Sequence, residues 1–293
     1  MATPLLDEEF LRKLEQLSLL ARKVRSGPSR GENISINRGA SLEFSDYRLY
    51  QPGDDFRYLD WNIYSRLNRL FVKVFTAEEN LTVHILLDTS RSMSFGTPSK
   101  LWYAGRVAAA LGYLAVNNLD RVGVSAFAEG VEHSLPPVRR TSHVFTIFDY
   151  IASLKPSGRT DFNRTLRDYS LHTRRPGLAI LITDLLDPGG YEEGLRALLY
   201  RRFDIMLIQV MDEAELEPQF KGPVRLIDGE TDEETELNVE PETITEYQQR
   251  LAGFFGEVEV FCVDHDIEYL RTSTRVPFED VVFSYLRRGV FVR

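Results

Sequence analysis

The feature that most constrains the fold is a regular alternation of apolar runs and helical patterns between residues 81 and 212. Four apolar runs predict buried strands, at 81–88, 121–128, 177–186 and 203–212. Helical periodicity lies between them, at 99–119, 142–154, 160–173 and 189–202, and residues 130–138 predict a short antiparallel edge strand. Apolar strands separated by helices predict an α/β fold with a mostly parallel central sheet and helices on both faces.

The segments on either side of this alternation are less regular. Leucines and other apolar residues at three- and four-residue intervals predict an amphipathic helix over 4–24. Residues 33–80, rich in aromatic side chains and arginine, predict short strands around a turn at 51–54. The predicted elements after residue 212 are a hairpin at 223–239, a helix at 243–265, a strand at 267–273 and a helix at 277–289. We therefore expect three parts: an N-terminal accessory region (1–80), an α/β domain (81–212), and a C-terminal region that packs with the accessory region (213–293).

Composition excludes several classes of protein. The formal net charge of -9 argues against a binder of nucleic-acid phosphates. The single cysteine, Cys262, leaves no intramolecular disulfide and no cysteine metal cage. The first residues lack the basic-then-apolar order of a signal peptide, and no run of about 18 uncharged apolar residues predicts a membrane span. We expect a cytoplasmic protein.

Two of the predicted strands end in an aspartate, Asp88 and Asp184. The carboxyl ends of parallel strands meet at one edge of a sheet, where ligands bind in open α/β folds. Ser90 and Ser92 follow Asp88 at alternate positions, and Thr160 lies in a glycine-containing loop just before a predicted helix. We expect these five side chains to converge on one point.

Carboxylate and hydroxyl oxygens without sulfur or imidazole suit a hard divalent cation. Mg²⁺ is the expected ion, with Mn²⁺ or Ca²⁺ as alternatives. Because three of the five candidate ligands are neutral hydroxyls, the ion would keep much of its charge and attract an external carboxylate.

The sequence Asp88-Thr89-Ser90-Arg91-Ser92, followed by Thr160 in "SGRTD" and Asp184 in "LITD", resembles the metal-ion-dependent adhesion site of von Willebrand factor A domains. The resemblance covers roughly residues 80–212 and implies a Rossmann-like fold of that type. It also implies that Ser90, Ser92 and Thr160 are direct metal ligands, that Asp88 and Asp184 act partly through waters, and that the ligand is an Asp or Glu of a protein partner.

The preceding segment, residues 42–75, resembles an uncharacterised bacterial family that carries this A domain and is associated with MoxR-type AAA+ ATPases. The resemblance implies a non-enzymatic adaptor or chaperone-like protein whose partner is such an ATPase or its client.

Two other functions compete with metal-dependent binding. In a Mg²⁺-dependent phosphatase, Asp88 would be the nucleophile, Lys155 the phosphate-binding lysine, and Asp184 with Asp187 the later acids. This arrangement is similar to that of haloacid-dehalogenase-like phosphatases, whose signature has a general acid/base two residues after the nucleophile, where this chain has Ser90. The other alternative is a structural module with a vestigial metal site.

Three further features have structural explanations that we favour. His84, inside an apolar strand, is predicted to be a hydrogen-bonded core residue. The segment 51–61 is predicted to be a turn with salt-bridged acids and a packed Trp61 rather than a partner-binding surface. The acidic run 228–236 is predicted to be a solvated turn, because it lacks the spacing of a calcium loop.

Overall fold

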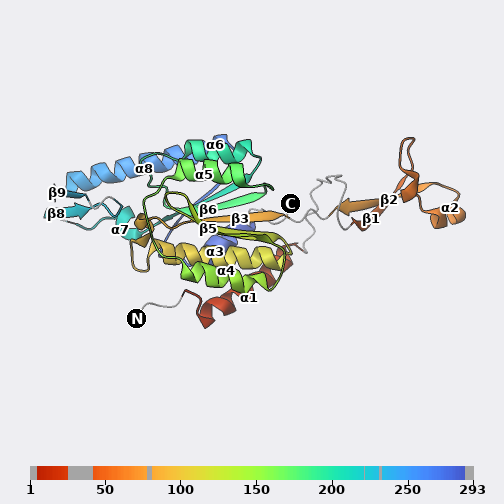
Figure 1. Ribbon diagram of the computed structural model, residues 1–293, viewed down its shortest axis with the longest axis horizontal. Coiled ribbons are helices and arrows are strands. Elements are labelled where there is room, and N and C mark those ends of the chain that lie inside the picture. Colours follow the sequence, from red (N-terminus) through yellow and green to blue (C-terminus); the bar gives the residue numbers. More distant parts are fainter. Residues whose placement is uncertain (1–4, 26–41, 78–80, 221, 231–232, 288–293) are drawn as a thin grey trace. The chain divides into compact units, whose positions relative to one another are not determined.

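The protein is described by a computed structural model that covers residues 5–25, 42–77, 81–220, 222–230 and 233–287 (Figure 1). The chain forms two compact units. Among the described residues, the first comprises 5–25 together with those from 81 to 287, and the second comprises 42–77.

The first unit is built on a six-stranded sheet in the order β10–β7–β6–β3–β4–β5. Its strands are β3 (Thr82–Asp88), β4 (Arg121–Phe127), β5 (Val131–Val138), β6 (Leu178–Thr183), β7 (Asp204–Met211) and β10 (Glu268–Ser273). All neighbours are parallel except β4 and β5, which are antiparallel. The predicted mostly parallel sheet with an antiparallel edge strand is therefore confirmed.

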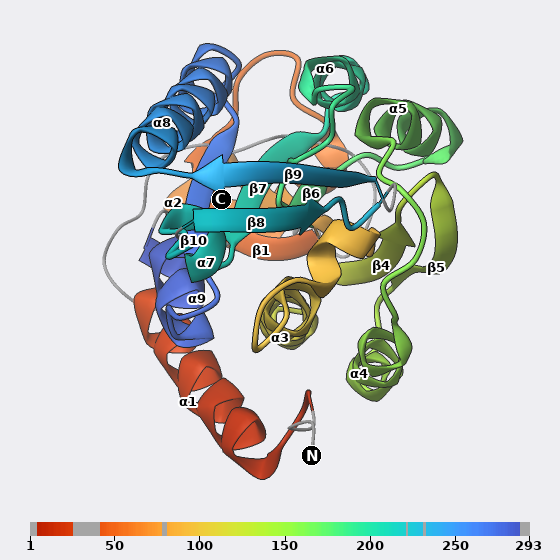
Figure 2. The same ribbon diagram turned by 90° about the vertical axis from the view of Figure 1, so that its left-hand side faces the viewer.

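Each face of this sheet carries its own hydrophobic core, because successive strand residues point to opposite sides. Ile85 and Leu87 of β3 belong to one core and Leu86 to the other. The first core is covered by α1 (Glu8–Arg25), α3 (Lys100–Asn117), α4 (His143–Ser153) and α9 (Phe278–Arg287). The second is covered by α5 (Phe162–His172), α6 (Glu192–Tyr200) and α8 (Pro241–Asp264). Figure 2 shows the two helical layers on opposite sides of the sheet.

The first unit resumes at residue 81 and continues past residue 212 into the C-terminal elements. Strand β10 pairs in parallel with β7, and α8 covers the second core, so both elements belong to the α/β unit. Helix α1 also packs there, against α3 and α9, and Lys13 of α1 pairs with Glu279 of α9 at 2.5 Å. The alternation of strands and helices thus continues beyond a hairpin, β8 (Gly222–Ile227) and β9 (Glu234–Val239), that interrupts it.

The second unit contains an antiparallel pair, β1 (Leu42–Leu49) and β2 (Phe71–Ala77). Between the strands lie a 3-10 turn, η1 (Phe56–Tyr58), and a helix, α2 (Trp61–Leu67), that the sequence pattern did not predict. The side chain of Asp60 accepts hydrogen bonds from the first backbone N–H groups of α2, which makes this aspartate its N-cap.

The acids of the predicted 51–61 turn form the expected ion pairs, whereas its tryptophan is not packed. The pairs are Arg48–Asp54, Arg57–Asp55 and Lys73–Asp60. Trp61 is 62% exposed, and its ring meets Tyr64 edge-on at the surface. The expectation that Trp61 is packed is wrong, because α2 has no buried side chain and offers no core for the indole to enter.

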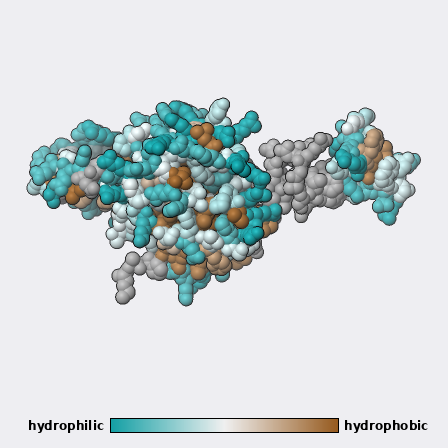
Figure 3. Space-filling model, viewed as in Figure 1, coloured by the Kyte–Doolittle hydropathy of each residue, from teal (hydrophilic) through white to brown (hydrophobic). Residues whose placement is uncertain are grey.

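The face of the protein seen in Figure 3 is mainly hydrophilic, with small separate hydrophobic patches. Within the described part of the chain, no helix has the length and apolar character needed to cross a membrane.

Replacing Gly177 by alanine is expected to destabilise the first unit by about 2 kcal/mol or more. A Cβ at this position would overlap with the backbone carbonyl of Thr82, which cannot move without disturbing the β3–β6 pairing. The matched control is Gly253→Ala in α8, where a Cβ meets nothing within 4 Å and alanine should stabilise the helix by about 0.5–1 kcal/mol. Urea unfolding of both variants measures the difference, and equal stability of the two would contradict the clash.

His84 is a hydrogen-bonded core residue, as predicted. It is 2% exposed, its Nδ1 lies 2.8 Å from the Tyr169 hydroxyl, and its Nε2 lies 3.0 Å from the Arg175 carbonyl. A neutral ring protonated on Nε2 donates to the carbonyl and accepts from the hydroxyl, so both nitrogens are satisfied.

Stability is expected to fall as the pH is lowered from 6.5 to 4 because of His84. Burial lowers the pKa of His84 from 6.5 to about 4, although its bond to the Arg175 carbonyl opposes this. The unfolded chain therefore binds a proton that the folded protein does not, and about 2–3 kcal/mol of stability present above pH 6.5 is lost by pH 4.5. Burial raises the pKa of Tyr169 to about 12, so this neighbour stays neutral throughout. Urea unfolding at pH 7 and 4.5 should show a smaller loss for His84→Gln than for the wild type, and an equal loss would exclude His84 as the cause.

Candidate metal centre

Asp88 and Asp184 lie at the carboxyl ends of two adjacent parallel strands. Asp88 is the last residue of β3, and Asp184 follows Thr183, the last residue of β6. Both aspartates are almost completely buried. The hydroxyl of Thr183 donates to Asp88 Oδ2 at 2.6 Å, which fixes this carboxylate at the edge of the sheet. The structure thus brings these two predicted residues to the same edge.

The loop after β3 brings both serine hydroxyls to this edge. Asp88 Oδ1 accepts the backbone N–H of Ser90 at 2.9 Å, closing a tight turn. The Oγ atoms of Ser90 and Ser92 are 3.0 Å apart, and Ser92 Oγ donates to Asp184 Oδ2 at 2.8 Å. Ser90, Ser92 and Asp184 therefore form a continuous hydrogen-bonded chain of oxygen atoms.

The spacing of these oxygens is that of hydrogen bonds and is also compatible with ligands of a divalent cation. In octahedral coordination at 2.0–2.1 Å, the distance between adjacent ligand oxygens is roughly 2.9 Å. The distances of 3.0 Å for Ser90–Ser92 and 2.8 Å for Ser92–Asp184 lie on either side of that value. All the donors are carboxylate or hydroxyl oxygens, which hard cations prefer.

Thr160 lies in a loop that is bound to the loop after β3. The backbone N–H of Ser157 donates to Thr89 O at 2.7 Å, and that of Arg91 donates to Gly158 O at 3.2 Å. The hydroxyl of Thr160 donates to Glu230 Oε1 at 3.0 Å. Backbone hydrogen bonds therefore join the two loops, and Glu230 is a carboxylate partner of Thr160 that the sequence did not indicate.

The two buried carboxylates repel each other electrostatically. Burial and the nearby carboxylate of Asp184 together raise the pKa of Asp88 to about 7, although the hydrogen bonds from Thr183 and Ser90 oppose the shift. A cation between the two groups would relieve this repulsion.

Sequence reasoning missed Lys100 and Glu215. Lys100, the first residue of α3, is completely buried, and its Nζ donates to Asp184 Oδ2 at 2.8 Å and to Glu215 Oε1 at 2.5 Å. Burial opposes the charge of Lys100, but Asp184 and Glu215 outweigh it and raise its pKa.

A sequence signal for Glu215 existed. Strand β7 is also followed directly by an acid, Asp212, which forms a capping box with Glu215 in the short helix α7 (Glu213–Leu216). This strand lies beside β6, so its carboxyl end reaches the same edge of the sheet as Asp88 and Asp184.

Two further findings bear on the site. Among the residues that the structure describes, no three His, Cys, Asp or Glu side chains are grouped to hold a metal, so the candidate centre depends on its hydroxyls. Lys155, the phosphate-binding lysine of the phosphatase alternative, is exposed, and the lysine that contacts Asp184 is Lys100.

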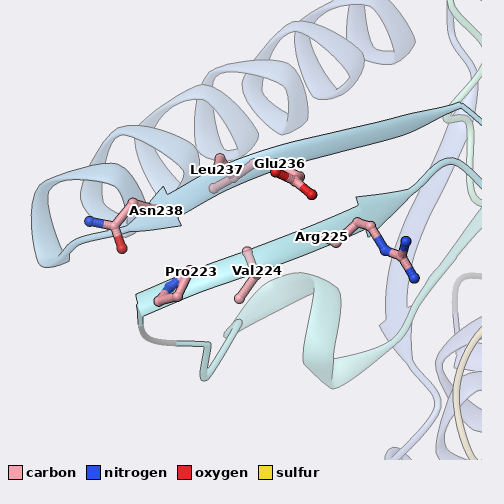
Figure 4. A pocket seen from close by; sticks show the side chains of 6 residues that line it. All are labelled: Pro223, Val224, Arg225, Glu236, Leu237 and Asn238. Atoms are coloured by element: carbon pink, nitrogen blue, oxygen red, sulfur yellow. The ribbon is translucent and has the colours of Figure 1, made fainter.

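A separate pocket of about 420 Å³ lies on the β8–β9 hairpin (Figure 4). None of the five candidate ligands lines this pocket. Its lining comes from both strands of the hairpin and consists of Pro223, Val224, Arg225, Glu236, Leu237 and Asn238.

Residues 46–253 match the family described as "Protein of unknown function DUF58". The chain belongs to the DUF58 family. The matched part contains all five candidate ligands, together with Lys100, Glu215 and Glu230.

Relatives and solved structures similar to this DUF58 protein include the following. An uncharacterized protein of Mycobacterium tuberculosis, Rv1480, is 29% identical over 86% of this chain and 81% of its own length. The crystal structure of BatB from Bacteroides thetaiotaomicron is similar at 18% identity and a TM-score of 0.43, over 71% of this chain and 99% of that chain. Manganese-loaded TRAP from Plasmodium vivax is similar at 18% identity and a TM-score of 0.32, over 45% and 57%.

Proposed function

We propose that this DUF58 protein is a metal-dependent protein-binding module. Ser90, Ser92 and Thr160 hold a divalent cation directly, and Asp88 and Asp184 hold it partly through waters. Mg²⁺ is the ion expected in the cell, with Mn²⁺ or Ca²⁺ as alternatives. The observation that carries the proposal is the chain of oxygens from Ser90 through Ser92 to Asp184, with octahedral spacing, at the ligand-binding edge of the sheet.

The bound cation would supply a coordination position for an Asp or Glu of a partner protein. The chain's own residues keep that position attractive to an anion. Three of the five ligands are neutral hydroxyls, and the ammonium of Lys100 on Asp184 offsets part of the remaining negative charge. The hydrogen bond from Thr183 fixes the carboxylate of Asp88, and Asp88 in turn fixes the turn that presents Ser90.

The partner that we propose is a MoxR-type AAA+ ATPase or its client, bound in the cytoplasm by a non-enzymatic adaptor or chaperone-like protein. Support comes from the resemblance of residues 42–75 to a family associated with such ATPases, and most of that segment lies in the DUF58 match.

Calorimetric titration of the EDTA-stripped protein with Mg²⁺ and with Mn²⁺ tests the metal site. We expect one ion to bind per chain. If neither Mg²⁺ nor Mn²⁺ binds, only the structural-module alternative remains.

Affinity capture from lysate of the source bacterium tests the partner. Because EDTA also removes Mg²⁺ from nucleotide-bound ATPases, the informative comparison is between wild-type and Ser90→Ala/Ser92→Ala baits in the same Mg²⁺ buffer. We expect a MoxR-type ATPase or its client on the wild-type bait alone. An identical partner set on both baits would remove the metal from the binding mechanism.

A further inference from the structure

We infer that Glu230 is an intramolecular ligand of the same cation, so that the chain carries its own substitute for the partner's carboxylate. This inference rests on the proposed metal site. It adds a metal-binding residue and a means of regulation: the carboxylate of Glu230 competes with that of the partner.

The contacts of Glu230 point to the candidate centre. Its Oε1 accepts the hydroxyl of Thr160 at 3.0 Å, and its Oε2 accepts the backbone N–H of Thr160 at 3.3 Å. The side chain of Arg159 donates to the carbonyl oxygen of Glu230 at 3.4 Å. Both carboxylate oxygens of Glu230 thus accept hydrogen bonds from Thr160, a predicted metal ligand 70 residues away in the sequence.

Glu230 is held in this position by the hairpin that carries it. It follows β8 in the turn to β9, and Asp228 Oδ1 accepts its backbone N–H at 2.8 Å. The backbone N–H of Asp228 in turn donates to Glu233 O at 2.9 Å. Glu230 is half-buried, whereas its neighbours Asp228 and Gly229 are exposed. In both views of the ribbon, the hairpin lies at the end of the sheet where α7 follows β7 (Figures 1 and 2).

The hydrogen-bonded separation of the two oxygens is compatible with a shared ion. Thr160 Oγ1 and Glu230 Oε1 are 3.0 Å apart, close to the roughly 2.9 Å between adjacent ligands of an octahedral Mg²⁺. Another acid of the hairpin, Glu234, is instead paired with Arg225 at 3.2 Å across the two strands.

The arrangement allows a partner to displace Glu230. Its two hydrogen bonds to Thr160 lie at a half-buried position, where water and a competing carboxylate can reach them. A partner carboxylate of adequate affinity could replace Glu230 without disturbing β3, β6 or the serine loop. Without a partner, Glu230 of the hairpin would occupy the coordination position. A partner carboxylate would occupy it by displacing Glu230.

The test uses Mn²⁺ as the ion, acetate as the external carboxylate, and water-proton relaxation as the measure of water bound to the metal. Glu230→Ala should raise the relaxivity of bound Mn²⁺ by the contribution of about one additional water and weaken Mn²⁺ binding on the order of 10-fold. Acetate should then lower the relaxivity of the variant at concentrations about 10-fold below those that affect the wild type. The matched control is Glu236→Ala, an exposed acid of β9 in the same hairpin, which should behave as the wild type.

The outcomes separate this inference from the proposed function. If wild type and Glu230→Ala both bind Mn²⁺ with the same relaxivity and the same response to acetate, Glu230 is not a ligand and the metal site still stands. If neither binds Mn²⁺, the metal site and the inference both fail. If Glu236→Ala changes the Mn²⁺ relaxivity and affinity as much as Glu230→Ala does, the effect comes from the net charge of the hairpin, and the inference fails.

Discussion

Mn²⁺ binding is expected to weaken by about 100-fold or more when Ser90 and Ser92 are both replaced by alanine, with little loss of stability. The substitution removes two oxygens at octahedral spacing and leaves the backbone of the loop anchored. The turn at Ser90 depends on its backbone N–H, which donates to Asp88, and Thr89 holds the loop to β4 through two bonds to the carbonyl of Phe127. Calorimetric titration with Mn²⁺ measures the affinity, and urea unfolding in EDTA measures the stability.

Ser94→Ala provides the matched control for this double variant. Ser94 lies in the same 3-10 turn, η2 (Arg91–Ser94), but its hydroxyl donates to the carbonyl of Arg91 at 2.7 Å and is exposed. It should leave Mn²⁺ affinity unchanged. Wild-type affinity in the Ser90→Ala/Ser92→Ala protein would place the ion elsewhere and remove the basis of the proposed function. Equal weakening by Ser94→Ala would mean that loop conformation, not ligand oxygens, sets the affinity.

The parts of the fold and site that the sequence predicted are those governed by local periodicity. Asp88 and Asp184 could be placed together because each ends an apolar run, and parallel strands align their carboxyl ends. The sequence predicts that Ser90 and Ser92 point the same way because they alternate along an extended loop. In the structure Ser92 lies instead in the 3-10 turn η2, and the two hydroxyls still meet.

The parts that sequence reasoning missed depend on contacts between distant segments. Glu230 was interpreted as part of a solvated acidic turn, because nothing within residues 228–236 indicates that Thr160 lies beside it. In the sequence, Lys100 resembles any lysine in the first turn of a helix. Only its contact with Asp184, 84 residues away, makes it part of the site. The sequence pattern assigns the strand at 267–273 to a separate C-terminal region, whereas in the structure it is β10 of the central sheet. The polar β8–β9 hairpin interrupts the alternation of strands and helices before α8, so the pattern does not show that the alternation continues.

Replacing Lys100 by methionine is expected to lower the stability of the metal-free protein by about 3–5 kcal/mol. Lys100 has no exposed surface, and its ammonium contacts Asp184 at 2.8 Å and Glu215 at 2.5 Å. Methionine fills a similar volume but leaves both carboxylates without their cation in a region of low dielectric constant. Urea unfolding in EDTA measures the loss, and Lys155→Met, the same change at an exposed lysine, should cost much less.

The same variant is expected to bind Mn²⁺ more tightly, on the order of 10-fold. The ammonium of Lys100 and the hydroxyl of Ser92 both donate to Asp184 Oδ2, so the lysine places a positive charge beside the oxygens that would hold the ion. Removing that charge makes the centre more attractive to a cation, and Mn²⁺ at 100 times its dissociation constant should restore about 2.7 kcal/mol of stability. Calorimetry and urea unfolding with and without Mn²⁺ measure the two effects. Weaker Mn²⁺ binding in Lys100→Met would instead show that the lysine serves the metal by orienting Asp184, and that its charge does not limit the affinity.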